Sequence, residues 1–156
     1  MLLHHLRARL TYALARRLFH WSWLVRQPRA WNWLEGQFAR MANLGDRSAQ
    51  SFYGHILLFR GHGFGAREEG IRLLRLAASA GDGKAAYQLG VLSLAGDTRN
   101  AADALEAARW WRLATDAGHP LAAQRLAELY RQGAAQLPAD AELAAQFGAR
   151  ARELGM

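Results

Sequence analysis

Large and small apolar residues recur along the chain with a period of 36 to 37 residues. The glycines that mark this period are separated by 36, 37 and 37 residues, at Gly45, Gly81, Gly118 and Gly155. An alanine follows four residues after each of the first three, at Ala49, Ala85 and Ala122. Four residues further on, a large apolar residue precedes a very small one, at Tyr53-Gly54, Leu89-Gly90 and Leu126-Ala127. Steps of four follow one face of a helix, so the pattern predicts three repeated helical units.

Each unit is expected to hold two helices. The first helix ends in a loop rich in glycine or proline (RGHGFG, AGDTRN or QGAAQLP), and the second ends on LLRLAASAG, WWRLATDAG or FGARARELG. Glycine just past a helix end suits the left-handed residue that commonly terminates a helix. Glycine within a helix costs about 1 kcal/mol relative to alanine, and we expect close helix packing at the small positions to offset that cost.

Residues 108–133, ARWWRLATDAGHPLAAQRLAELYRQG, resemble the junction between two Sel1-like repeats, which are relatives of the tetratricopeptide repeats. The family pattern is A-x-x-x-L-G-x-x-Y-x-x-G-x-G-V, followed by A-x-x-W-x-x-x-A-x-x-x-G. The segment GHGF at 61–64 falls on the loop of this pattern, and residues 71–74 fall on its A-x-x-W with leucine in place of tryptophan. The chain departs from the pattern where GDTRN lacks the second glycine, where Ala127 replaces a glycine, and where Gly148 stands in the position of Trp111.

The resemblance implies an all-α fold, a right-handed α-solenoid of about four antiparallel helix pairs. Residues 9–44 fit the same period as a degenerate first unit with a loop around Pro28, and terminal repeats are commonly atypical. We therefore expect a basic, tryptophan-rich segment with a degenerate first helix pair or cap at 1–44. Sel1-like repeats are expected at 45–80 and 81–117, and a last repeat with the C-terminal cap at 118–156.

The net positive charge of the chain, +7, is concentrated near its N-terminus. Residues 1–44 hold seven arginines and one acid, Glu35, whereas residues 45–156 are nearly neutral. Nucleic-acid binding needs basic residues gathered over a binding face, so this distribution argues against nucleic acid as the partner. Any anionic partner is expected to meet the N-terminal segment.

An apolar stripe at helical spacing runs through that segment, along Leu3, Leu6, Leu10, Leu14, Leu18, Trp21, Leu24 and Val25. Arginines interrupt the segment, which excludes a transmembrane span of roughly 20 apolar residues. The apolar run LTYALA is also shorter than the roughly 7–15 residues of a secretory signal. We therefore expect a cytoplasmic protein. Peripheral contact with an anionic membrane stays open as an alternative, through Arg7, Arg9, Arg16, Trp23 and Trp31.

The sequence carries no recognisable catalytic or metal-binding constellation. There is no cysteine and no G-x-S-x-G motif, and none of the six histidines shows the i, i+4 spacing of metal ligands with a nearby carboxylate. The loop GHGFGAREEG is glycine-rich, but it follows a predicted helix and lacks the lysine and Ser/Thr of a phosphate-binding loop. Its Glu68-Glu69 would also repel phosphate. We therefore expect no enzyme activity, no metal and no cofactor.

In related solenoids the first helix of each pair lines the face that receives a protein or peptide. If the positions four, eight and twelve residues after each glycine face the core, those seven, ten and fourteen after it face away. We expect a protein or peptide partner to be bound near this face by Phe52, His55, Phe59, Tyr87, Gln88, Val91, Arg125 and Glu128. For Phe52 and Phe59 an equal alternative is packing against the degenerate first unit.

Four of the six tryptophans lie in the segment WSWLVRQPRAWNW at 21–33. On a helix the two members of each W-x-W pair point about 200° apart. One tryptophan of each pair can then enter the core while the other stays outside. We expect Trp23 and Trp31 to be the exposed ones.

Overall fold

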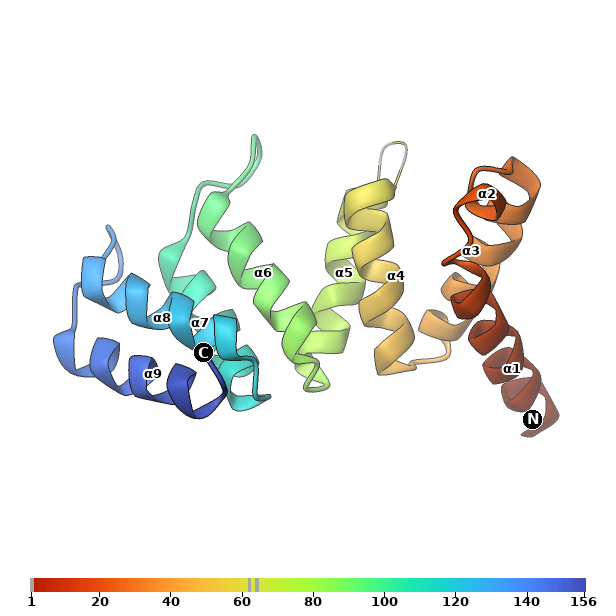
Figure 1. Cartoon of the computed structure of the whole chain (residues 1–156). Coiled ribbons are helices and arrows are strands. Elements are labelled where there is room, and N and C mark those ends of the chain that lie inside the picture. The colour runs from red at the N-terminus through yellow and green to blue at the C-terminus, as the bar shows by residue number, and fades with distance from the viewer. Residues whose placement is uncertain (1, 62, 64) are drawn as a thin grey trace. The chain divides into compact units, whose positions relative to one another are not determined.

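The computed structural model describes residues 2–61, 63 and 65–156, with side chains from His5 onward. Within these ranges the chain is helical and has no strand, which confirms the predicted all-α class (Figure 1). The side chain of Leu3 and the loop residues His62 and Phe64, which the sequence patterns include, lie outside the described part. The helices are α1 (Leu2–Leu18), α2 (Ser22–Val25), α3 (Pro28–Asn43), α4 (Arg47–Arg60), α5 (Ala66–Ser79), α6 (Gly83–Ala95), α7 (Ala104–Asp116), α8 (Pro120–Gln132) and α9 (Ala141–Glu153).

A glycine followed by an aspartate links the end of one helix to the start of the next, at Gly45-Asp46 and Gly81-Asp82. Gly45 and Gly81 adopt φ values of 86° and 89°, in the left-handed region that favours glycine. The residue after each glycine then caps the following helix, because Asp46 accepts a hydrogen bond from the amide of Ala49 at 2.8 Å. Asp82 does the same for α6. The predicted left-handed glycines are confirmed, and their spacing sets the period of the helix pairs.

Neighbouring helices in the sequence pack against each other, as the predicted helix pairs require. α3 contacts both α1 and α4, and α7 contacts both α6 and α8, while α9 packs on α8 (Figure 1). In α5, Gly70 lies against the backbone of α4, where an added methyl group would come within 2.9 Å of the Gly54 carbonyl oxygen. α2 is a single short turn between the helices of the first pair. Pro28 begins α3, a position that suits its fixed φ and missing N–H.

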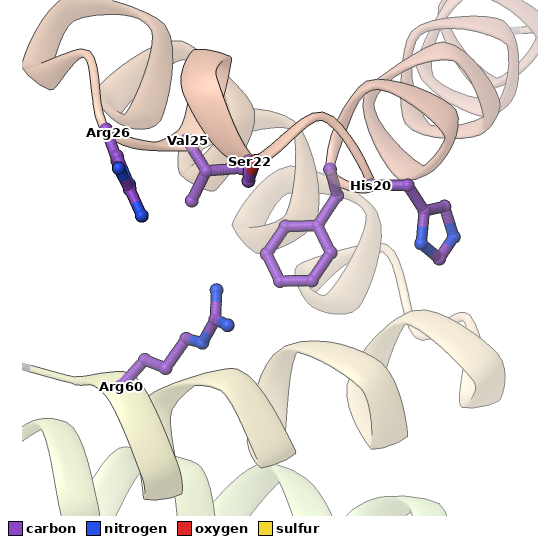
Figure 2. A pocket seen from close by; sticks show the side chains of 6 residues that line it. His20, Ser22, Val25, Arg26 and Arg60 are labelled. Carbon is purple, nitrogen blue, oxygen red and sulfur yellow. The ribbon is translucent and has the colours of Figure 1, made fainter.

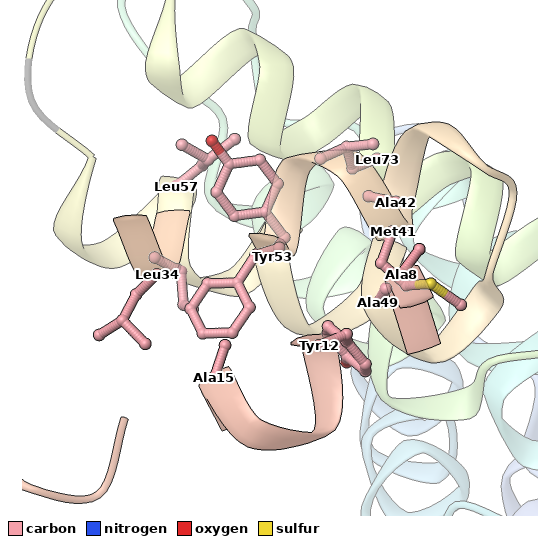
Figure 3. Close-up of a cluster of buried hydrophobic side chains, with 12 residues drawn as sticks. Ala8, Tyr12, Ala15, Leu34, Met41, Ala42, Ala49, Tyr53, Leu57 and Leu73 are labelled. Atoms are coloured by element: carbon pink, nitrogen blue, oxygen red, sulfur yellow. The ribbon is translucent and has the colours of Figure 1, made fainter. Parts of the chain in front are cut away.

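The chain divides into two compact units, Met1–Leu73 and Leu74–Met156, and the division falls within α5. The core of the first unit gathers side chains from α1, α3, α4 and α5 around Leu34 and Phe38, which are fully buried (Figure 3). The core of the second unit is built mainly from alanine and leucine around Trp111, the largest of its fully buried side chains.

The face of α1 that enters the core is not the face that carries its leucine stripe. Its buried side chains are Ala8, Tyr12 and Ala15 (Figure 3). The leucines of the predicted stripe, Leu6, Leu10 and Leu14, are instead 52% to 65% exposed. These leucines therefore share one face of the helix, and that face points away from the core.

Packing distance explains why these three residues, and not the leucines, enter the core. Small residues at 8 and 15 let α1 approach α3 more closely than leucines would. Between them, the ring of Tyr12 packs edge to face on Phe38, with centroids 6.1 Å apart. The helix also ends at Leu18, before the end of the predicted stripe, because the chain turns there and brings Phe19 against the core.

Candidate functional site

The two phenylalanines predicted on the outer face of α4 have different surroundings. Phe52 is half-buried and packs edge to face on Phe19 and Phe38, with centroids 5.4 and 5.1 Å away. The guanidinium of Arg16 covers the same ring at 5.3 Å. Phe52 thus packs against the degenerate first unit, which was one of the two alternatives that the sequence left open. Little of its ring is free for a partner.

Phe59, by contrast, is 66% exposed although it lies two turns further along the same face. Its ring is stacked on His55, with centroids 6.4 Å apart and 21° between the planes. His55 is held in turn by a hydrogen bond from its Nδ1 to the carbonyl of Ser51 at 2.7 Å. Together Phe59 and His55 form an ordered aromatic step at the surface of the first unit.

In the second unit the predicted Tyr87 is half-buried between two rings. It stacks on His119, with centroids 4.7 Å apart and 10° between the planes, and on Trp111 at 6.5 Å. The indole Nε1 of Trp111 donates to the backbone carbonyl of Tyr87 at 3.1 Å. Burial lowers the pKa of His119, and the charge of Lys84 lowers it further. This stack fixes the start of α8 against α6.

The remaining predicted contact residues are polar or partly covered. Gln88 and Val91 of α6 are both half-buried. On α8, Arg125 and Glu128 form an ion pair at 3.4 Å, one helical turn apart. Their charges neutralise each other locally, so the two residues offer a partner little net charge.

The N-terminal residues predicted to meet an anionic surface do not share one environment. Arg7, Arg9 and Arg16 are exposed, and Trp23 is 60% exposed. Trp31 is half-buried and packs against Phe19, with centroids 6.4 Å apart, so its predicted exposure is wrong. Trp31 lies three residues before Leu34 on the face of α3 that continues to Phe38 and Met41, and this spacing in the sequence would have revealed its burial.

The other two tryptophans of the segment are Trp21 and Trp33, and both are exposed. The expectation that one member of each W-x-W pair enters the core is therefore wrong for the first pair. Trp21 and Trp23 lie at the start of α2, a helix too short to bury any of its residues. In the second pair one ring does pack on the core, as expected. That ring is Trp31, whereas Trp33 is exposed.

The described residues contain neither a cluster of metal ligands nor a membrane-spanning helix. No three histidine, aspartate or glutamate side chains in this part of the chain are grouped so that they could hold a metal ion. None of its helices combines the length and the apolar character needed to cross a membrane.

Comparisons with known proteins identify three consecutive repeats in this chain. The Sel1 repeat family matches residues 47–82, 83–119 and 120–156. Among solved structures, a Sel1 repeat protein from Oxalobacter formigenes is 28% identical, with a TM-score of 0.68 over 78% of this chain and 34% of that one. A protective antigen of uropathogenic Escherichia coli strains, which displays an SLR fold, is 23% identical, with a TM-score of 0.68 over 79% of this chain and 26% of that one.

The chain therefore spans about a quarter to a third of the solved proteins that it matches. A comparison with curated proteins gives no match. The family assignment rests on three consecutive matches that cover most of the chain, together with the glycine-to-aspartate steps and the packed helix pairs. On this evidence the chain belongs to the Sel1 repeat family.

Proposed function

We propose that the chain is a non-enzymatic helical-repeat scaffold that binds a protein or a peptide. Sel1 repeat proteins generally serve as scaffolds for protein–protein interaction. The observation that carries the proposal here is the aromatic step of Phe59 and His55 on α4, the first helix of a repeat. Exposed aromatic rings held in one orientation are enriched at protein interfaces, because they bury a large area at little entropic cost.

Affinity capture with the full chain tests this proposal. A Phe59→Ser variant should lose specific partners, because it removes an exposed ring without opening the core. Gln88→Ala provides the same test on α6 of the second unit. Leu113→Ser is a matched control, since this leucine is 46% exposed but lies on a second helix. Partners that remain bound equally to all four proteins would contradict a role for these first-helix residues.

A second candidate function is attachment to an anionic membrane through α1, and the exposed leucine face favours it. Leu6, Leu10 and Leu14 follow one another at steps of four and so form a continuous apolar stripe. At 100° per residue, Arg7 lies on one side of this stripe and Arg9 and Arg16 lie on the other. Leucines flanked by arginines on both sides are typical of a helix that lies in the membrane interface.

The charges of the segment favour an anionic lipid over a neutral one. α1 contains no acidic residue, and each arginine near an anionic surface contributes about 1 kcal/mol. The exposed Trp21 and Trp23 follow directly after α1, and tryptophan is enriched in the headgroup region. Both the apolar and the charged parts of the segment therefore complement the same surface.

Vesicle sedimentation tests this second candidate. We expect the full chain to bind vesicles of phosphatidylglycerol more strongly than vesicles of phosphatidylcholine, and to lose affinity as salt shortens the Debye length from about 10 Å to about 3 Å. Replacing Leu6, Leu10 and Leu14 by serine should weaken binding about 100-fold or more, because each leucine contributes at least about 1 kcal/mol.

The matched control replaces Leu105 and Leu113 of α7, which are also exposed, by serine. This control should bind as the unchanged chain does. Equal vesicle binding by the α1 variant and the unchanged chain would rule out the leucine face as the membrane contact. Retention of protein partners but not of vesicles by the α1 variant would separate the two candidate functions.

A further inference from the structure

A pocket of about 380 Å³ opens in the first unit, between the chain that follows α1 and the C-terminal end of α4 (Figure 2). It is lined by Phe19, His20, Ser22, Val25, Arg26 and Arg60. Phe19 and Val25 are half-buried and pack on the core, so they give the pocket a firm apolar wall. The polar lining groups come from two separate segments of the chain.

Two guanidinium groups enter this pocket from opposite sides. Figure 2 shows Arg26 reaching in from the end of α2 and Arg60 from the end of α4. No acidic residue lines the pocket, and within the described part of the chain neither arginine forms a salt bridge. The two positive charges therefore share one space that no carboxylate of the described chain neutralises.

One of the two arginines is positioned by an aromatic ring. The guanidinium of Arg60 lies over Phe19, 5.4 Å from the ring centroid. Phe19 is held by edge-to-face contacts with Phe38 and Phe52, at 6.0 and 5.4 Å. Stacking on Phe19 holds the side chain of Arg60 in the pocket. This side chain therefore loses less conformational entropy when it binds an anion.

We propose that this pocket binds a carboxylate carried by a peptide, with an apolar group next to it. A guanidinium presents paired N–H donors that match the two oxygens of a carboxylate, and the hydroxyl of Ser22 supplies another donor. The pocket is too large for a carboxylate alone, and its apolar wall suits an adjoining hydrocarbon or aromatic side chain. This inference rests on the proposed peptide-binding function, and it names the group that would be recognised.

The carboxylate can come from a chain terminus or from an acidic side chain, and simple probes separate these sources. N-acetyl-phenylalanine carries a terminal carboxylate beside an aromatic ring. N-acetyl-glutamyl-phenylalanine amide carries only a side-chain carboxylate. N-acetyl-phenylalanine amide is the uncharged control. Each probe is titrated into the full chain, and binding is followed by NMR shifts of the backbone amides of Ser22, Val25 and Gly61.

We expect saturable shifts with at least one carboxylate probe and not with the uncharged amide. Arg26→Gln and Arg60→Gln should each weaken binding about tenfold or more, because each removes a charge-assisted hydrogen bond. Both arginines are exposed, so the variants should fold. Arg29→Gln, at an exposed arginine outside the pocket, is the matched control and should bind normally.

Three results would overturn the assignment. These are the absence of saturation with both carboxylate probes, equal binding of the amide, and an equal loss of affinity in Arg29→Gln. The partner-capture experiment on Phe59 is independent of these probes. Loss of partners in Phe59→Ser without any probe binding would reject the carboxylate pocket and leave the scaffold proposal standing.

Discussion

The contact between Gly90 and Trp111 shows why a single residue type is needed within a helix. Trp111 is 2% exposed, and its Nε1 is fixed by the hydrogen bond to the Tyr87 carbonyl. A methyl group at position 90 would collide with the indole ring. The glycine of α6 therefore leaves room for the tryptophan of α7.

Gly90→Ala should destabilise the protein by about 1–3 kcal/mol, the usual cost of overpacking a core. The measurement is urea unfolding of the variant beside the unchanged chain. Gly148→Ala is the matched control in α9, where the nearest atoms would lie 4.0 Å from an added methyl group. This control should be neutral or stabilising by up to about 1 kcal/mol. A Gly90→Ala protein as stable as the control would refute the close-contact explanation.

His119 links the stability of the second unit to pH. Its ring is half-buried against Tyr87, and its Nδ1 is buried without a hydrogen-bond partner in the described part of the chain. Burial and Lys84 lower its pKa, and Asp82 opposes them only in part. The folded state thus binds a proton less readily than the unfolded state does.

Since the unfolded state takes up this proton first, folding stability should be complete above pH about 6.5 and should fall as the pH drops through the lower pKa of the folded state. Urea unfolding between pH about 7.5 and about 5 measures the loss. His119→Gln should reduce the loss, and Lys84→Ala should reduce it less strongly. The same loss in His119→Gln as in the unchanged chain would assign the effect to other groups.

At the scale of an element, the tryptophans of the N-terminal segment separate into packed and exposed ones. Trp31 continues the buried face of α3, whereas Trp23 lies on α2, which has no fully buried residue. Whether each ring is buried depends on the length of its helix and on the helices that pack against it. The two residues therefore provide a direct comparison of an aromatic ring inside and outside the packing of one unit.

Trp31→Ala should destabilise the first unit by about 1–3 kcal/mol, less than for a fully buried tryptophan because the ring is only half-covered. Trp23→Ala should change stability by no more than about 0.5 kcal/mol. Thermal or urea unfolding of the two variants checks both values. Equal destabilisation by the two substitutions would contradict the packing described for this segment.

At the scale of the whole molecule, stability is expected to be divided along the chain. Helices contact mainly their neighbours in sequence, as in repeat proteins generally, and two compact units result. The charge is divided as well, because most of the net +7 belongs to residues 1–44. A local change is therefore expected to act mostly within its own unit.

Amide hydrogen exchange of the Gly90→Ala protein tests this division. Protection should fall in α6, α7 and α8 and change much less in α1 and α3, because repeat proteins transmit destabilisation mainly between adjacent repeats. Gly148→Ala is again the control and should retain protection throughout. Loss of protection by an equal amount in every helix would show that the chain unfolds as one cooperative unit.

The sequence was sufficient to place most of the candidate contact residues on a helix and on a face of that helix. It was not sufficient to predict which of their side chains are exposed. The spacing of Phe52 and Phe59 put both on one face of α4, which is correct. Only the fold reveals that Phe19 and Phe38 cover Phe52 and leave Phe59 free. The pocket with Arg26 and Arg60 has no local signal, because its two charges are 34 residues apart in the chain.

The sequence by itself determined the helical class, the family and the glycine steps, because these depend on local periodicity and on backbone conformations that only certain residues adopt. The tertiary structure decided which face of each helix is buried. For α1 it chose Ala8, Tyr12 and Ala15 over the leucines, since close approach to α3 favours small residues around one aromatic ring. Burial depends on the shape of the neighbouring helix, and hydrophobicity along a single helix does not contain that information.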